Sequence, residues 1–273
     1  MSILLITDTQ LGMAKKNLNS EMWNPKISKW LEGLEPSLKE LINLNKIESI
    51  VNKFSPEFIV HAGDIVNEID KAEDLENYLK FSNNINLKIH HIPGNHDVGI
   101  DPNNLSMKGL EFYKKNFGND FYNFNWKGFE LIFLNGSKFI NYQNSNIYNE
   151  QLNFIKETLK NFKSPKRIIV FMHQPPYIDE KDILRRGEKD LHGKDISYWA
   201  FENKINDEFF NLFENHSLEY IFTGHLHINL ETQFKNTKII VTSAVGVPLG
   251  NDPSGYRIID FKNEKLTYDF YKI

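Results

Sequence analysis

The chain has 273 residues, of which 40% are hydrophobic and 25% are charged, a composition that excludes a disordered or fibrous protein. It contains no cysteine, which excludes disulfides, iron–sulfur clusters, thiolate metal sites and cysteine nucleophiles. A metal ion would therefore need His, carboxylate or amide ligands. The formal net charge of −4 argues weakly against a nucleic-acid partner, which usually requires a basic surface.

No apolar run in the sequence is long enough to cross a bilayer, which takes about 20 residues. The longest runs, at 3–6 and 168–172, have the length of strands. Residues 1–2 lead directly into an apolar run, with no basic region and no cleavage site, so we expect a cytoplasmic protein.

The first half of the chain alternates between strand and helix patterns. Residues 2–7 predict a buried strand, and apolar residues mostly three or four apart predict a helix from Pro36 to about Phe54. The elements that follow are a strand at 58–60, a helix at 72–81, a strand at 87–92 and a helix at 104–117. This order is typical of strand–helix units on a partly parallel sheet.

The second half of the chain is richer in strands. We predict a glycine-marked hairpin at 121–126 and 129–134, helices at 148–162 and 201–213, and strands at 167–172, 220–223, 228–234, 237–242, 256–260 and 266–271. No repeat or break in composition interrupts the chain. We therefore predict one α/β domain over residues 1–273, a four-layer α/β/β/α sandwich of two mixed sheets.

Two segments, 12–35 and 178–200, lack a strong core pattern. Long irregular segments in a compact domain are often functional, so we expect either solvated surface loops or loops that face a substrate.

Five short polar motifs each begin where an apolar run ends. They are Asp8-Thr9-Gln10, Gly63-Asp64, Gly94-Asn95-His96-Asp97, His173 and Gly224-His225-Leu226-His227. Because the carboxyl ends of parallel strands meet at one edge of a sheet, we expect these motifs to converge. The seven side chains that could bind metal are more than one ion needs, and a pair of divalent ions that share Asp64 fits the number. These seven are Asp8, Gln10, Asp64, Asn95, His173, His225 and His227.

The order of these motifs resembles the motif series of the calcineurin-like metallophosphoesterase superfamily, over residues 8–227. Gln10, the stretch 94–99 and the tail 243–255 are also similar to an animal branch of that superfamily, which is described as serine/threonine phosphatases. The resemblance implies a phosphoesterase with two divalent metal ions and the sandwich fold.

The resemblance also implies roles for individual residues. The first ion would bind to Asp8, Gln10, Asp64 and His227, and the second to Asp64, Asn95, His173 and His225. Asn95 would also contact the substrate, His96 would act as general acid, and Asp97 would orient the His96 imidazole. A metal-bound hydroxide would then attack phosphorus in line.

Gln10 departs from the commoner pattern, which has His at this position. A neutral amide oxygen is a hard ligand, so it favours manganese or magnesium over iron or zinc, and we predict Mn²⁺. The alternative is that Gln10 does not bind metal and one ion is held poorly.

Three other polar sites have weaker patterns. Arg185 and Arg186 would either bind the free oxygens of a phosphate or form a solvated charge pair on a loop. Asn67 would support the metal ligands or serve in a turn. His61, inside an apolar strand, fits a packed or supporting histidine better than a ligand.

The resemblance favours phosphomonoesters as substrates, including phosphoserine and phosphothreonine, so the partner would be a phosphorylated small molecule or phosphoprotein. A phosphodiesterase that acts on cyclic nucleotides or phospholipid head groups is an alternative. A binding scaffold without turnover is a third interpretation, against which the intact His96 argues, because a scaffold needs no proton donor.

Overall fold

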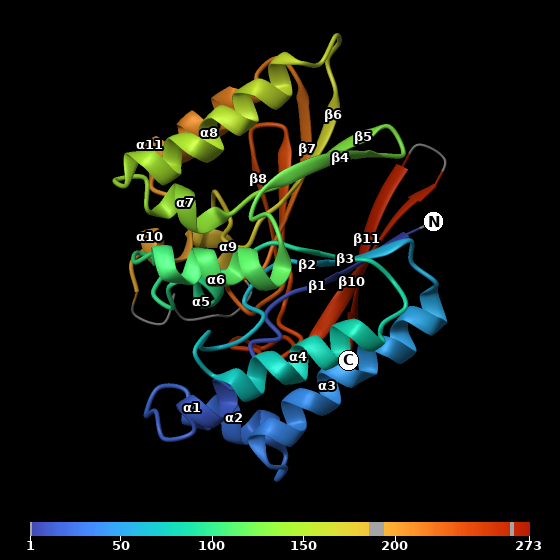
Figure 1. The fold of residues 1–273 in the computed structure, drawn as a ribbon, viewed down its shortest axis with the longest axis vertical. Helices are drawn as coiled ribbons and strands as arrows, with labels where there is room; N and C mark the ends of the chain where they lie inside the picture. The colour runs from blue at the N-terminus through green and yellow to red at the C-terminus, as the bar shows by residue number, and fades with distance from the viewer. Residues whose placement is uncertain (1, 186–193, 263–264) are drawn as a thin grey trace.

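A computed structural model describes residues 2–185, 194–262 and 265–273, in which two β-sheets pack face to face (Figure 1). The five-stranded sheet has the order β11-β10-β1-β2-β3. Its strands are β1 (Ser2–Ile6), β2 (Phe58–His61), β3 (Ile89–His91), β10 (Gly255–Lys262) and β11 (Lys265–Lys272). The six-stranded sheet has the order β4-β5-β6-β7-β9-β8. Its strands are β4 (Tyr122–Trp126), β5 (Phe129–Phe133), β6 (Arg167–Phe171), β7 (Ser217–Thr223), β8 (Leu230–Phe234) and β9 (Thr237–Val241).

Both sheets are mixed, as predicted. In the first sheet β1, β2 and β3 run parallel, whereas β10 and β11 run antiparallel to their neighbours. In the second sheet β5, β6, β7 and β9 run parallel, and β4 and β8 close the edges in antiparallel pairs. The carboxyl ends of β1, β2 and β3 therefore lie at one edge of their sheet, and those of β6 and β7 at one edge of the other.

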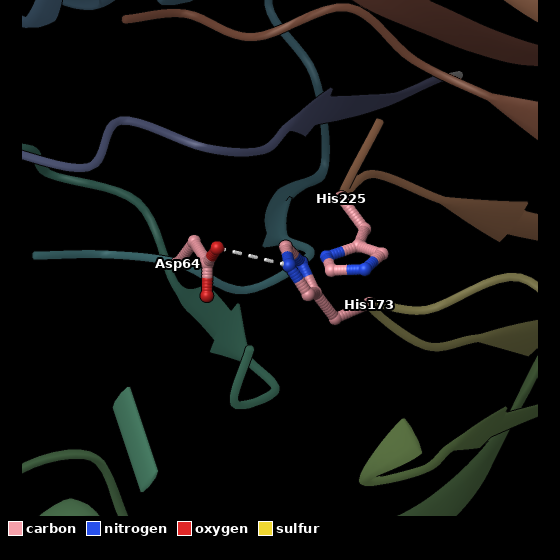
Figure 2. A group of neighbouring side chains, drawn as sticks. All are labelled: Asp64, His173 and His225. Atoms are coloured by element: carbon pink, nitrogen blue, oxygen red, sulfur yellow. Dashed lines mark ion pairs between the residues drawn. The ribbon is translucent and has the colours of Figure 1, made fainter. Parts of the chain in front are cut away.

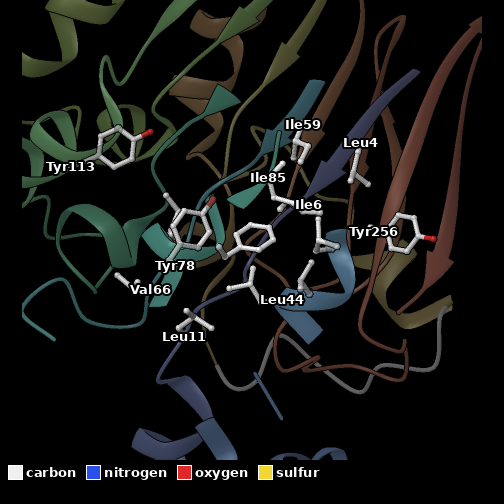
Figure 3. Close-up of a cluster of buried hydrophobic side chains, with 14 of the residues drawn as sticks. Leu4, Ile6, Leu11, Leu44, Ile59, Val66, Tyr78, Ile85, Tyr113 and Tyr256 are labelled. Atoms are coloured by element: carbon white, nitrogen blue, oxygen red, sulfur yellow. The ribbon is translucent and has the colours of Figure 1, made fainter. Parts of the chain in front are cut away.

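Helices cover the outer faces of the two sheets and confirm the four-layer sandwich. The five-stranded sheet packs against α3 (Pro36–Phe54), α4 (Ala72–Asn84) and α6 (Met107–Phe117) through the apolar cluster drawn in Figure 3. The six-stranded sheet packs against α8 (Ser145–Lys160) and α11 (Asn203–Leu212). A third apolar cluster fills the space between the sheets.

Strand β1 shows why its sequence is apolar at consecutive positions. Ile3 and Leu5 belong to the core between the sheets, whereas Leu4 and Ile6 pack toward the helices. Because successive side chains of a strand point to opposite faces, a strand in the middle of this sandwich must be apolar on both faces.

The segment 12–35 is not the long irregular stretch that the sequence predicted. It contains α1 (Met13–Asn17) and α2 (Asn24–Leu31). Their buried side chains pack against Val247 and Leu249, and Trp30 Nε1 donates a 2.8 Å hydrogen bond to Ser254 Oγ. Each helix is so short that its few apolar residues show no clear period in the sequence.

The segment 178–200 is also partly helical, with α9 (Glu180–Arg185) and α10 (Ile196–Trp199) on either side of residues that lie outside the described part. Ile178, Ile183 and Trp199 are buried against Leu226 and Ile228. Two further short helices that the sequence pattern did not predict are α5 (Asn95–Val98) and α7 (Gly136–Ile140). None of the helices in the described ranges has the length and apolar character needed to cross a membrane.

Glu40 on α3 is a buried acid that holds the start of α1. Its carboxylate accepts 2.8 Å hydrogen bonds from the backbone N–H groups of Gly12 and Ala14, and the residue is 3% exposed. Burial raises the pKa of Glu40 to about 7, and the nearby Asp74 contributes to the rise. Ionisation of Glu40 therefore costs the folded state free energy.

This buried acid predicts a pH dependence of stability. Because its folded pKa is raised, the stability that Glu40 contributes is fully present below pH 4.5 and is lost as the pH rises through about 7. Relative to Glu40→Gln, which has no charge at any pH, the unmodified protein should lose on the order of 2–3 kcal/mol of unfolding free energy across that window. Urea unfolding of both proteins from pH 4.5 to 8 measures the difference, with the exposed Glu76→Gln as the control. Parallel pH curves for the unmodified protein and Glu40→Gln would contradict the prediction.

Candidate metal centre

The predicted metal ligands follow strand ends in both sheets. Asp8 follows β1, Asp64 follows β2, and His173 follows β6. Backbone hydrogen bonds join the loops that carry them, from Asp8 N to Gly63 O (2.9 Å) and from Gly224 N to His173 O (3.0 Å). The second of these bonds also brings the motif after β7 to the same place.

The His and Asp side chains form two groups that share one residue. Asp64, His173 and His225 make up the first group, which is drawn in Figure 2. Asp8, Asp64 and His227 make up the second, and in each group the ligand atoms lie within 4.8 Å of one another. Asp64 is therefore placed between two potential metal sites, where the sequence predicted a shared carboxylate.

The distances between these side chains are short. His173 Nε2 lies 3.1 Å from Asp64 Oδ2 and 3.7 Å from Asp8 Oδ1. His227 Nε2 lies 3.1 Å from the same Asp8 Oδ1. All of these residues are buried.

Each imidazole of the centre is oriented by a backbone carbonyl on its far side. His173 Nδ1 donates to Ala62 O (2.7 Å), and His227 Nδ1 donates to Val247 O (2.6 Å). His225 uses the opposite nitrogen, since its Nε2 donates to Tyr198 O (3.1 Å). The other nitrogen of each ring is then free to bind a metal ion, which is the usual way that proteins orient His ligands.

Several polar atoms of the centre are buried without a hydrogen bond. They are Asp8 Oδ1, Gln10 Oε1 and His173 Nε2. By contrast, Asp8 Oδ2 accepts hydrogen bonds from Thr7 Oγ1 (2.7 Å) and His225 N (3.1 Å). A buried polar atom with no hydrogen bond is unfavourable, and divalent cations at the two potential sites would satisfy these atoms. The residues present thus fit a pair of metal ions.

The backbone at the centre is strained. The φ angle is positive at Asp8 (50°), Gln10 (37°), Asp64 (52°), His225 (71°) and His227 (54°). Residues other than glycine rarely adopt this left-handed conformation, and where they do, the strain often marks a functional site.

Gly94 and Gly224 make room for the carboxylates. A Cβ atom on Gly94 would overlap the carboxylate and the backbone nitrogen of Asp64, and one on Gly224 would overlap Thr7 and Asp8. Gly94 has an ordinary φ of −94°, so close approach, and not backbone conformation, explains this glycine.

The charges of the centre shift one another's pKa values. Burial alone would raise the pKa of Asp64 and Asp8, but the neighbouring histidines outweigh it and lower both. Burial would lower the pKa of His173, but Asp64 and Asp8 raise it to about 9. Burial and the adjacent His173 lower the pKa of His225 to about 3. The centre is therefore a cluster of ionised carboxylates, a setting that favours cations.

Asn95 begins α5, beside the first group. Its Nδ2 donates to Ile100 O (2.6 Å), and its Oδ1 lies 3.4 Å from Gln174 Nε2. Gln174 also donates to Ser137 Oγ (3.0 Å), so its amide links the Asn95 side chain to α7. Sequence reasoning missed Gln174, although its position next to His173 was a usable signal.

The structure corrects the predicted role of Asp97. Its carboxylate accepts backbone N–H groups of Gly94 (2.8 Å) and Ile65 (3.0 Å), so it holds the loops of the centre together and does not orient His96. Burial and Asp64 raise the pKa of Asp97 to about 7. The His96 ring is oriented instead by Asn67, whose backbone carbonyl accepts a 2.7 Å hydrogen bond from Nδ1.

The remaining predicted residues lie in several places. His61 is a packed residue, with Nε2 3.0 Å from Thr9 Oγ1. Arg185 is the last residue of α9, but its side chain lies outside the described part, as does all of Arg186. Tyr198 and Trp199 on α10 pack their rings near His225, a contact that the sequence pattern did not indicate.

Comparisons with known proteins show which family and which folds this chain resembles. The family model for calcineurin-like phosphoesterases matches residues 1–229. The human serine/threonine-protein phosphatase CPPED1 is 24% identical over 283 residues, which covers 99% of this chain and 83% of the human protein. A dimetal phosphatase from Danio rerio has a TM-score of 0.62 at 12% identity and covers 99% of this chain and 95% of its own. A purple acid phosphatase from yellow lupin has a TM-score of 0.65 at 12% identity, covering 100% of this chain and 51% of its own.

The fold and the paired ligand groups define a dimetal phosphoesterase. The chain belongs to the calcineurin-like phosphoesterase family, whose members are metal-dependent enzymes that hydrolyse phosphoesters. The similarity to CPPED1 extends over almost the whole chain, as the resemblance in the sequence motifs predicted.

The close approach at Gly94 predicts a specific loss of metal binding. Gly94→Ala should lower Mn²⁺ affinity by at least about tenfold, because the new Cβ displaces the Asp64 carboxylate. Gly128→Ala is the control, since its surroundings are open and only its φ of +84° disfavours alanine, at a cost of roughly 1–2 kcal/mol in stability. Isothermal titration calorimetry with Mn²⁺ compares the two. Unchanged Mn²⁺ affinity in Gly94→Ala would contradict the role given to this glycine.

Proposed function

We propose that the protein hydrolyses phosphomonoesters, including phosphoserine or phosphothreonine, with two divalent ions bound at this centre. The observation that supports the proposal most directly is the shared Asp64, which belongs to both groups of potential ligands. The similarity to a serine/threonine-protein phosphatase supports the choice of monoesters.

The two ions would bind to the ligand sets expected from the motifs. Asp8, Gln10, Asp64 and His227 would bind one ion, and Asp64, Asn95, His173 and His225 the other. When bound, such a pair of ions activates water as a nucleophile and polarises the phosphoryl oxygens. The protein orients the side chains through the outward hydrogen bonds of the three histidines, and Asn95 would contact the substrate.

His96 is our candidate for the general acid. It lies next to Asn95, its backbone N–H donates to Asp64 Oδ1 (2.9 Å), and its side chain is partly exposed. Because Nδ1 donates to the Asn67 carbonyl, Nε2 is the nitrogen that can give a proton to the leaving oxygen.

We propose Mn²⁺ as the activating metal. The buried Gln10 Oε1, with no hydrogen bond, supplies a neutral oxygen in place of the imidazole found in the commoner motif. An oxygen ligand favours Mn²⁺ or Mg²⁺ over Fe or Zn²⁺.

A substrate screen tests this function. p-Nitrophenyl phosphate should be hydrolysed with a kcat/KM at least about tenfold above that for bis-p-nitrophenyl phosphate, and Mn²⁺ should be the strongest activator when each metal is added separately. Phosphoserine and phosphothreonine peptides extend the screen to phosphoproteins. A strong preference for the diester would support the phosphodiesterase alternative, and two bound ions without turnover of any substrate would support the silent scaffold.

A substitution at His96 tests the proton donor. His96→Ala should lower kcat by roughly 10²- to 10⁴-fold while both ions remain bound, because the ring is not assigned to either ligand set. His216→Ala is the control and should keep the activity of the unmodified protein. His216 lies far from the centre, where its Nδ1 accepts a hydrogen bond from Lys166 N. If His96→Ala kept full kcat with two ions bound, the assignment of the general acid would be wrong.

A further inference from the structure

Asn67 lies between Gln10 and His96 and contacts both. Its side-chain Oδ1 accepts a 3.1 Å hydrogen bond from Gln10 Nε2, and its backbone carbonyl accepts the 2.7 Å hydrogen bond from His96 Nδ1. Asn67 is 4% exposed, so water competes little for either contact.

An amide ligand must be turned the right way. The two ends of a carboxamide have nearly the same shape, but only the oxygen can bind a cation, and the NH₂ group would repel it. In this structure the NH₂ group of Gln10 is used by Asn67, and Gln10 Oε1 is buried with no hydrogen bond. The contact with Asn67 therefore leaves the oxygen of Gln10 for the metal.

The two side chains are held on neighbouring stretches of backbone. Gln10 N donates to Asp64 O (2.9 Å), and Asn67 N donates to Leu11 O (2.9 Å), so the pairing of β1 with β2 continues past the ends of both strands. An isolated parallel bridge between Leu11 and Val66 lies within this pairing. Gln10 and Asn67 are thus fixed relative to each other by the backbone.

We propose that Asn67 is a positioning residue that selects the carbonyl end of Gln10 as the ligand for the first metal ion. Through its backbone carbonyl the same residue orients His96, so one asparagine positions both a metal ligand and the candidate proton donor. This inference rests on the proposed function, because it requires that two ions bind at the centre.

The side chain and the backbone of Asn67 can be tested separately. Asn67→Ala removes the acceptor for Gln10 but keeps the carbonyl that orients His96, whereas Asn67→Asp keeps an acceptor at the same position. Loss of such a supporting contact weakens metal binding by roughly 10- to 100-fold. We expect this loss at one of the two ions in Asn67→Ala, and affinities within about threefold of the unmodified protein in Asn67→Asp.

The readout is metal binding itself. Calorimetric titration of the metal-free protein with Mn²⁺ gives the number of ions and their affinities, and electron paramagnetic resonance distinguishes a coupled pair of Mn²⁺ ions from a single one. Asn206→Ala is the matched control, because Asn206 is also buried but lies on α11, away from the centre. It should bind two ions as the unmodified protein does. Thermal unfolding without metal checks that each variant folds, and Asn67→Ser, whose side chain is too short to reach Gln10, replaces Asn67→Ala if alanine prevents folding.

A second comparison asks whether Asn67 acts through Gln10. If it does, adding Asn67→Ala to Gln10→Ala should weaken Mn²⁺ binding by less than about twofold beyond Gln10→Ala alone, because the orienting contact is already gone. Additive effects of the two substitutions would overturn the inference. Unmodified Mn²⁺ binding in Asn67→Ala, or an equal loss in Asn67→Asp, would also overturn it. An unmodified chain that binds fewer than two ions would overturn the proposed function, and this inference with it.

Discussion

The carboxylate of Asp64 is the group on which the rest of the centre depends. It belongs to both groups of potential ligands, and its approach requires a strained backbone at Asp64 and the absence of a side chain at Gly94. A negative charge in this position would be costly in a buried site without nearby positive charge. A pair of cations held by the two groups would offset that cost, so the placement of Asp64 in both groups suits a centre that binds two metal ions.

The outer parts of the fold support this centre through the histidines. His227 is oriented by Val247, whose loop packs against α1 and α2, and His225 is oriented by Tyr198 on α10. One hydrogen bond therefore connects α10 to a ligand, and α1 and α2 are connected to another ligand through their apolar contact with Val247. Because a carbonyl on the far side of each ring sets its orientation, we expect changes in these peripheral segments to alter metal binding without direct contact with the ions.

Some predictions from the sequence failed for identifiable physical reasons. Asp97 was expected to orient His96 because the two are adjacent, but adjacent residues of a helix point in different directions, and Asp97 bonds to backbone N–H groups at residues 65 and 94. The helices within 12–35 are stabilised by tertiary contacts with Val247 and Leu249, which no local period reveals. Gln174 was missed as a support because its partner Asn95 is distant in the sequence, and Asn67 was missed in this role because it uses a backbone carbonyl, which every residue has.

The sequence by itself determined the layers of the fold and the residues that meet at its edge. Apolar runs followed at once by polar motifs identify buried strands and their carboxyl ends, and parallel strands must bring those ends together. Only the tertiary structure decided which nitrogen or oxygen of each side chain faces the centre. That choice depends on the hydrogen bond made on the other side, as between Gln10 and Asn67, and the partner comes from another part of the chain that sequence spacing does not place.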